Sequence, residues 1–206
     1  EMGGDFYDVI KIDEEKTGIM IADVTGHGIP AALVCAMLKM AFANNKEYAQ
    51  HPAVLLTKLN KDLSNNIKEN YITAAYALID TKNKTVTVSS AGHWSPLLIK
   101  INGSIFNNWP KGFPIGWVED GTYEETTTTY STGDKFLLYT DGIIEARNPD
   151  NKIFGFERLT DYINTNYLTN PQAFINGLIN TLYTWGEMNQ SDSFNDDVTI
   201  ILAELS

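Results

Sequence analysis

The feature that most constrains this chain is the repeated placement of aspartate beside glycine or at the ends of short apolar segments. Apolar segments of this length, bounded by glycine and polar residues, are typical of buried strands. Acids on a solvated surface more often lie within helices or polar stretches. A fold that brings these segment ends together would gather several carboxylates in one place. The acids concerned are Asp5 after Gly3–Gly4, Asp23 after Ile19–Ala22, Asp141 between Phe136–Thr140 and Gly142, and Asp196 with Asp197 before the last apolar segment.

The pattern along the chain predicts an α+β fold built on antiparallel hairpins. Turn-rich segments such as 82–84 separate the expected strands, and a proline opens three of the expected helices, as is common at the first helical position. The only low-complexity stretch is the threonine run 126–129. No linker or repeat divides the sequence, so we expect a single domain over residues 1–206. The expected strands are 6–12, 17–23, 71–79, 85–90, 97–101, 135–139 and 197–203, and the expected helices are 30–43, 52–63, 156–167 and 171–185.

Carboxylates gathered in one place predict a divalent cation. Like charges at close range raise one another's pKa values unless a cation neutralises them. Ligand sets made of oxygen atoms favour Mg²⁺ or Mn²⁺, whereas zinc usually recruits histidine or cysteine. The chain has three histidines and one cysteine. A site for magnesium or manganese therefore fits this sequence better than a zinc site.

Charge and composition exclude several other classes of protein. The formal net charge is -11, which argues against binding to nucleic acid or to an anionic membrane. No apolar stretch approaches the length of a membrane span, so this part of the chain is not expected to insert into a bilayer. The single cysteine, Cys35, cannot form an internal disulfide, which favours a cytoplasmic location. Because it lies within an expected helix, we interpret Cys35 as a small buried apolar residue.

Five ordered motifs resemble those of the metal-dependent PPM (type 2C) serine/threonine phosphatases, most closely the bacterial SpoIIE/RsbU branch. The resemblance extends over essentially the whole chain. It implies a four-layer α-β-β-α sandwich with two central antiparallel sheets. The motifs are Gly3–Asp8, Ala22–Gly28, Ala91–His93, Tyr139–Arg147 and Asp196–Thr199.

The same resemblance implies an enzyme with two Mn²⁺ or Mg²⁺ ions and assigns the residues that hold them. Asp23 corresponds to the carboxylate that bridges both ions, and the backbone carbonyl of Val24 binds one of them. Asp141 and Asp196 correspond to ligands of the other ion, while Asp5 holds the second metal directly or through water. Asp23, Asp141 and Asp196 are thus the expected catalytic residues. The ions would activate a water molecule for in-line attack on a phosphoester. The roles of the motif residues Asp8 and Asp197 are left open. His27 and His93 are candidates for a catalytic acid, but a loop histidine more commonly hydrogen-bonds the backbone.

In this branch the usual substrate is a STAS-domain anti-sigma-factor antagonist phosphorylated on serine or threonine. The resemblance therefore implies a bacterial partner-switching pathway and an upstream sensor or regulatory domain in a longer protein, which could be membrane-bound with this domain in the cytoplasm. It is also compatible with a homodimer. The sequence departs from the branch at Trp94–Ser95, where relatives often have Asn-Pro after the Ala-Gly-His motif.

Three alternative functions account less well for the sequence. Gly3–Phe6 superficially resembles the signature of diguanylate cyclases, but that reading leaves the later motifs unexplained. A pseudophosphatase that keeps the fold to bind a partner is disfavoured because Asp23, Asp141 and Asp196 are all present. A calcium-binding or adhesion module is disfavoured because the closely spaced acids of an EF-hand loop are absent.

Overall fold

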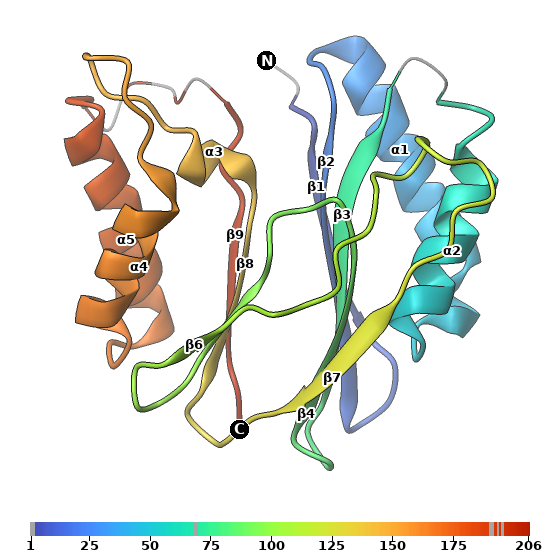
Figure 1. Ribbon diagram of the computed structural model, residues 1–206, viewed down its shortest axis with the longest axis horizontal. Helices are drawn as coiled ribbons and strands as arrows, with labels where there is room; N and C mark the ends of the chain where they lie inside the picture. Colours follow the sequence, from blue (N-terminus) through green and yellow to red (C-terminus); the bar gives the residue numbers. More distant parts are fainter. Residues whose placement is uncertain (1–2, 68–69, 190–191, 193, 195) are drawn as a thin grey trace. The chain divides into compact units, whose positions relative to one another are not determined.

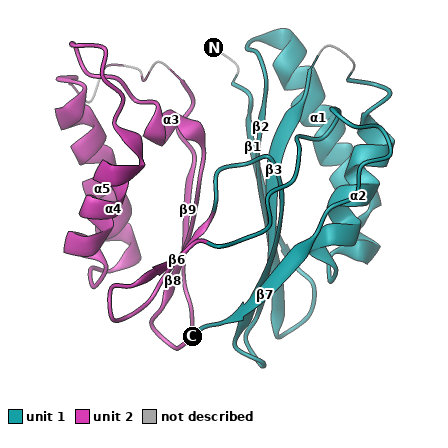
Figure 2. Cartoon of the chain, viewed as in Figure 1, with its two compact units in different colours: residues 1–95, 108–130 teal, residues 96–107, 131–206 magenta. Residues whose placement is uncertain are grey.

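The computed structural model describes residues 3–67, 70–189, 192, 194 and 196–206. The chain divides into two compact units, coloured separately in Figure 2. Unit 1 comprises residues 1–95 and 108–130, and unit 2 comprises residues 96–107 and 131–206. Each unit contains one antiparallel sheet and has helices packed on it, which agrees with the α+β prediction. The expectation of a single domain over residues 1–206 stays a prediction.

Unit 1 is built on a five-stranded sheet in the order β1-β2-β3-β4-β7. Alternate residues of β2 and β3 form one apolar cluster with the helices α1 and α2, which cover the same face of the sheet (Figure 1). The elements are β1 (Asp5–Lys11), β2 (Lys16–Val24), α1 (Ile29–Asn44), a short 3₁₀ helix η1 (Lys46–Tyr48), α2 (Pro52–Leu63), β3 (Ile72–Asp80), β4 (Thr85–Ala91) and β7 (Glu125–Thr129).

Unit 2 is built on a four-stranded sheet in the order β6-β5-β8-β9. The apolar faces of α4 and α5 pack with residues of β5 and β8 in a second core that includes Tyr139 and Phe174. The elements are β5 (Leu97–Ile99), β6 (Ile105–Phe106), β8 (Lys135–Tyr139), α3 (Asp141–Ile144), α4 (Gly155–Asn166), α5 (Pro171–Trp185) and β9 (Ile200–Glu204). None of the described helices has the length and hydropathy needed to cross a bilayer.

Most of the predicted elements are confirmed within a few residues, and the exceptions have physical reasons. The threonine run 126–129 is the edge strand β7, where Thr127 Oγ1 lies 2.8 Å from Thr87 Oγ1 of β4. Threonine is β-branched and suits a half-exposed strand, so this low-complexity run forms a strand that the sequence analysis did not expect. The last strand begins at Ile200 and not at Asp197.

Candidate functional site

In unit 1, two of the predicted ligands are placed together by strand register. Asp5 and Asp23 are directly opposite each other in the β1–β2 ladder, and Asp23 is directly opposite Thr73 in the β2–β3 ladder. Residues opposite one another in a ladder project to the same face of a sheet. The neighbouring residues Val24 and Ile72 belong to the core beneath the helices. Asp5, Asp23 and Thr73 therefore form a row on the face that points away from α1 and α2.

Gly4 leaves open the space beside two of the predicted metal-binding oxygens. The backbone N–H of Val24 donates to Gly4 O at 3.0 Å, which holds the two segments close. A Cβ added at Gly4 would lie 2.4 Å from Val24 O and 3.1 Å from Asp23 Oδ1. Any side chain at this position would fill the space beside those oxygens. A carbonyl and a carboxylate facing a space kept open by glycine fit a hard divalent cation.

Cys35 differs from its prediction as a buried apolar residue. The residue is only partly buried, and its Sγ donates a hydrogen bond to Gly4 O at 3.1 Å. This contact links α1 to the segment that precedes β1. The side chain thus supports the backbone around Asp5 and is more than a filler of the core.

In unit 2, Asp141 is positioned by the junction between β8 and α3. β8 ends at Tyr139, as expected, and Asp141 is the first residue of the short helix α3 that follows. Thr140 N donates to Thr199 O at 3.1 Å, and Thr199 N donates to Thr140 Oγ1 at 3.0 Å. These bonds hold the start of α3 against the segment that leads into β9.

Gly142 allows that segment to approach α3 closely. A Cβ at Gly142 would lie 2.0 Å from the carbonyl oxygen of Asp197 and would clash with it. Asp196 is adjacent, and its Oδ1 accepts a hydrogen bond from Asp197 N at 2.8 Å. The structure therefore places Asp141 beside the Asp196–Asp197 segment, as the motif order predicts.

The surroundings of the Asp141 carboxyl disfavour its charged form. Burial raises the pKa of Asp141, and the nearby carboxylates of Asp196 and Glu145 raise it further, against a smaller lowering by backbone N–H groups. A bound cation would reverse these effects by stabilising the charged carboxylate. Glu145 was not predicted as a member of this group. It follows α3, and its N–H donates to Asp141 O at 2.7 Å.

The predicted ligands occur as a pair in each unit. Among the residues that the structure describes, no group of three or more His, Cys, Asp or Glu side chains is gathered as a metal site. The donor atoms of the pairs are carboxylate and carbonyl oxygens. This donor chemistry fits Mg²⁺ or Mn²⁺ and does not fit a zinc site of the usual kind.

Of the motif residues without an assigned role, His93 has the most defined environment. Its Nδ1 lies 2.8 Å from Thr73 Oγ1, the threonine opposite Asp23. His27 is exposed on the loop after β2, and Asp8 Oδ1 accepts from the backbone N–H of Val9 at 2.8 Å. Sequence patterns gave no sign of the contact between His93 and Thr73, because it joins the segment after β4 to a residue of β3.

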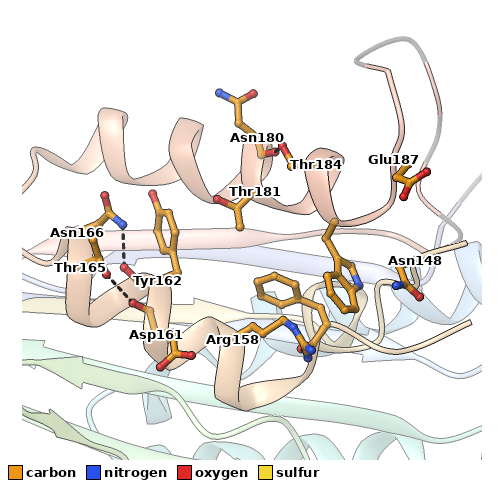
Figure 3. A pocket seen from close by; sticks show the side chains of 12 residues that line it. Asn148, Arg158, Asp161, Tyr162, Thr165, Asn166, Asn180, Thr181, Thr184 and Glu187 are labelled. Atoms are coloured by element: carbon orange, nitrogen blue, oxygen red, sulfur yellow. Dashed lines mark hydrogen bonds between the residues drawn. The ribbon is translucent and has the colours of Figure 1, made fainter. Parts of the chain in front are cut away.

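A hollow in unit 2 lies between α4 and α5 (Figure 3). It has a volume of about 730 Å³, and its wall includes Arg158, whose guanidinium lies 4.1 Å from the centre of the Trp185 ring. Several threonines of the wall donate to backbone carbonyls of their own helix, as Thr165 does to Asp161 O. None of the predicted ligands lines this hollow.

Comparison with known proteins identifies relatives of the whole chain. The family model described as "Stage II sporulation protein E (SpoIIE)" matches residues 13–206. Phosphoserine phosphatase RsbU of Bacillus subtilis (strain 168) is 30% identical over 204 residues, which are 98% of this chain and 59% of RsbU. The chain thus spans less than two thirds of the length of this curated relative.

Solved structures match the fold. The SiaA-PP2C domain of Pseudomonas aeruginosa superposes with a TM-score of 0.87 at 20% identity, covering 99% of this chain and 81% of that one. RsbX, solved in complex with magnesium, superposes with a TM-score of 0.71 at 24% identity, covering 100% of this chain and 89% of that one. These matches confirm the predicted phosphatase-type fold.

Proposed function

The chain belongs to the SpoIIE family, and on that premise we propose that it is a metal-dependent phosphatase acting on phosphoserine or phosphothreonine in proteins. The observation that carries the proposal is the pairing of Asp5 with Asp23 across β1 and β2, beside the space that Gly4 keeps open. A related protein, RsbU, is named a phosphoserine phosphatase. The five motifs that suggest this chemistry occur in the same order along the chain, between residues 3 and 199.

We propose that Asp5, Asp23, Val24 O, Asp141 and Asp196 would hold two Mg²⁺ or Mn²⁺ ions. Bound divalent cations supply a water of lowered pKa and neutralise the charge of the phosphoryl group. RsbX, a structural neighbour, was solved with magnesium. Backbone contacts hold the aspartates in position. Strand register positions Asp23, and the hydrogen bonds between Thr140 and Thr199 position the start of α3, where Asp141 lies.

The proposed substrate is a folded phosphoprotein, specifically a phosphorylated STAS-domain protein of a partner-switching pathway. The chain has only two arginines. Arg147 Nη1 donates to Asn151 O at 3.1 Å, and Arg158 stacks on Trp185. Because both guanidinium groups are engaged within unit 2, recognition would depend on contacts remote from the phosphate. Control by a regulatory domain and a cytoplasmic location belong to the same proposal.

The test is a phosphate-release assay with a phosphoserine protein in Mn²⁺ or Mg²⁺, repeated with excess chelator. We expect chelation to abolish turnover, since water is a weak nucleophile without a metal to acidify it. Asp23→Asn is expected to cause the largest loss of any single ligand change. Asp161→Asn, at an exposed acid on α4, is the matched control and should keep wild-type turnover. Full activity in chelator, or in Asp23→Asn at low metal, would overturn the proposal.

Substrate class is tested separately. We expect kcat/KM for a phosphorylated STAS-domain protein to exceed that for a short phosphopeptide of the same local sequence, because only the folded protein offers remote contacts. Equal values for the two substrates would contradict this part of the proposal while leaving the phosphatase activity intact.

A further inference from the structure

Trp117 is the most exposed of the four tryptophans, with 63% of its surface accessible to solvent. The next residue, Val118, is also exposed. Isolated apolar side chains on a surface are normal, whereas an exposed indole ring beside a second apolar residue is typical of a surface that contacts another molecule. The surroundings of Trp117 decide between these two cases.

The loop that carries Trp117 is held by a buried side chain of α2. Asn60 has no exposed surface, and its Nδ2 donates to Val118 O at 2.7 Å and to Glu119 O at 3.1 Å. Its Oδ1 accepts the N–H of Gly116 at 2.9 Å. In Figure 1 this loop runs beside α2 before the chain enters β7. A surface held in place in this way loses little conformational entropy when it binds a partner.

Trp117 also lies close to the strand end that carries the proposed metal ligand Asp23. The centre of its ring is 5.4 Å from that of Tyr71, the residue before β3. The N–H of Thr25 donates to Tyr71 O at 3.1 Å, and Thr25 is two residues after Asp23. Adjacent strands are about 4.8 Å apart, so a few residues of extended substrate chain can reach from Asp23 to the indole ring.

The charges around Trp117 indicate what kind of partner fits. The segment 108–124 contains three acids and one lysine. Two of the acids, Glu119 and Asp120, directly follow Val118 and are exposed. An apolar surface with acids at its edge is complementary to an apolar side chain that has a lysine or an arginine next to it.

We propose that Tyr71, Trp117 and Val118 form a docking surface for the phosphoprotein substrate, here called the Trp117 surface. It selects substrates with an apolar residue and a lysine or arginine near the phosphoserine; this inference rests on the proposed function. The apolar side chain packs on the indole ring, and the cation pairs with Asp120. The Trp117 surface thereby supplies contacts remote from the phosphate, on which recognition of the substrate depends.

Three phosphoserine peptides that differ only beside the phosphoserine test the inference. The first has leucine and lysine on both sides, the second has alanine and glutamine in their place, and the third has glutamate in place of lysine only. We expect wild type to prefer the first peptide over the second by about tenfold in kcat/KM. The difference should lie mainly in KM, because a docking contact acts on the bound substrate and the transition state alike. Equal values for these two peptides would overturn the inference.

Substitution of Trp117 tests which residue carries the preference. Trp117→Ala should bring the ratio of kcat/KM for the first two peptides close to 1, whereas Trp117→Phe keeps an aromatic ring and should retain most of the preference. Leu168→Ala, at an apolar residue of unit 2 that is 70% exposed, is the matched control and should keep the wild-type ratio. Melting temperatures check that each variant is folded. An undiminished preference in Trp117→Ala would count against the Trp117 surface.

Asp120→Lys tests the charge at the edge of the Trp117 surface. We expect this change to turn the preference from the lysine peptide toward the glutamate peptide, because it reverses the sign of the interacting charge. Added salt should weaken the preference of wild type for the lysine peptide, since exposed charges are screened. The same order of the two peptides in wild type and variant would contradict the pairing with Asp120.

Hydrolysis of p-nitrophenyl phosphate separates failure of this inference from failure of the proposed function. This compound is too small to contact Trp117, so its hydrolysis reports on the metal site. If wild type hydrolyses it but shows no preference among the peptides, the docking surface is wrong and the phosphatase activity stands. If wild type hydrolyses none of these substrates in Mn²⁺, the proposed function fails and this inference fails with it. A changed oligomeric state in Trp117→Ala with an unchanged peptide preference would assign the surface to contact between copies of the chain and would also overturn the inference.

Discussion

The two acidic pairs are held in place by different kinds of structure. In unit 1, Asp5 and Asp23 lie on paired strands, and the regular ladder fixes their separation. In unit 2, Asp141 begins a four-residue helix and Asp196 lies in an irregular segment. A few specific contacts therefore hold this pair in position. In a ladder many hydrogen bonds together hold each residue in position, whereas the position of Asp141 at the start of α3 depends on each of a few contacts. We therefore expect the unit 2 pair to be more sensitive to single substitutions.

The largest expected effect is the response of stability to metal. Ligand at 100 times its Kd stabilises a folded protein by about 2.7 kcal/mol for a single site. Asp141→Asn should shrink the Mn²⁺-induced rise in melting temperature, while the metal-free variant is no less stable than wild type because a repelling, partly buried charge is removed. Thermal melts of both proteins with chelator and with Mn²⁺ measure this. A rise of the same size in both would mean that Asp141 is not a ligand.

Gly142→Ala and Gly4→Ala compare the two regions directly. At Gly142 the added methyl meets the backbone of the Asp197 segment, and overpacking of this kind costs about 1–3 kcal/mol. At Gly4 the methyl meets Val24 O near the end of an edge strand, where the backbone can shift more easily. Denaturant unfolding should show the larger loss of stability for Gly142→Ala. A larger loss for Gly4→Ala would reverse the comparison.

Thr140→Val isolates one contact of the junction. Thr140 Oγ1 accepts the N–H of Thr199, and its removal should cost about 1 kcal/mol of unfolding free energy. Thr127→Val on the exposed edge strand β7 is the matched control and should cost less, because water can replace its partner. Chemical denaturation of both variants checks this. Equal losses of unfolding free energy in the two variants would show that the contact between Thr140 and Thr199 matters no more than a contact at the edge of the sheet.

The smallest expected effect is a change of metal-free stability with pH. Burial and two nearby carboxylates raise the pKa of Asp141 in the folded chain above its ordinary value of 3.8. The folded state thus binds this proton more tightly than the unfolded state. Protonation of Asp141 therefore contributes to the stability of the folded state. This contribution is complete below pH 3.8 and is lost as the pH rises through the raised pKa of the folded state. Asp141→Asn should flatten that part of the stability profile, and an unchanged profile would contradict the assignment.

The sequence by itself determined most of the strands and helices, and the family. Alternation and apolar runs identified β2, β3 and β8, and proline marked the starts of α1, α2 and α5, because these signals are local in the chain. The ordered motifs identified the acids, since motif order does not depend on how the chain folds. The threonine strand β7 was missed because its residues lack an apolar pattern and are stabilised as a strand by pairing with β4.

Only the tertiary structure decided which side chains meet. The alignment of Asp5 with Asp23 and Thr73, the contact of His93 with Thr73, and the approach of Gly142 to the Asp197 carbonyl each join segments that are distant in sequence. Register and close approach depend on the whole set of packed neighbours, and a shift of one residue would turn a strand's side chains to the opposite face. Such contacts have no local signature, so the site's supporting residues became visible only in the folded chain.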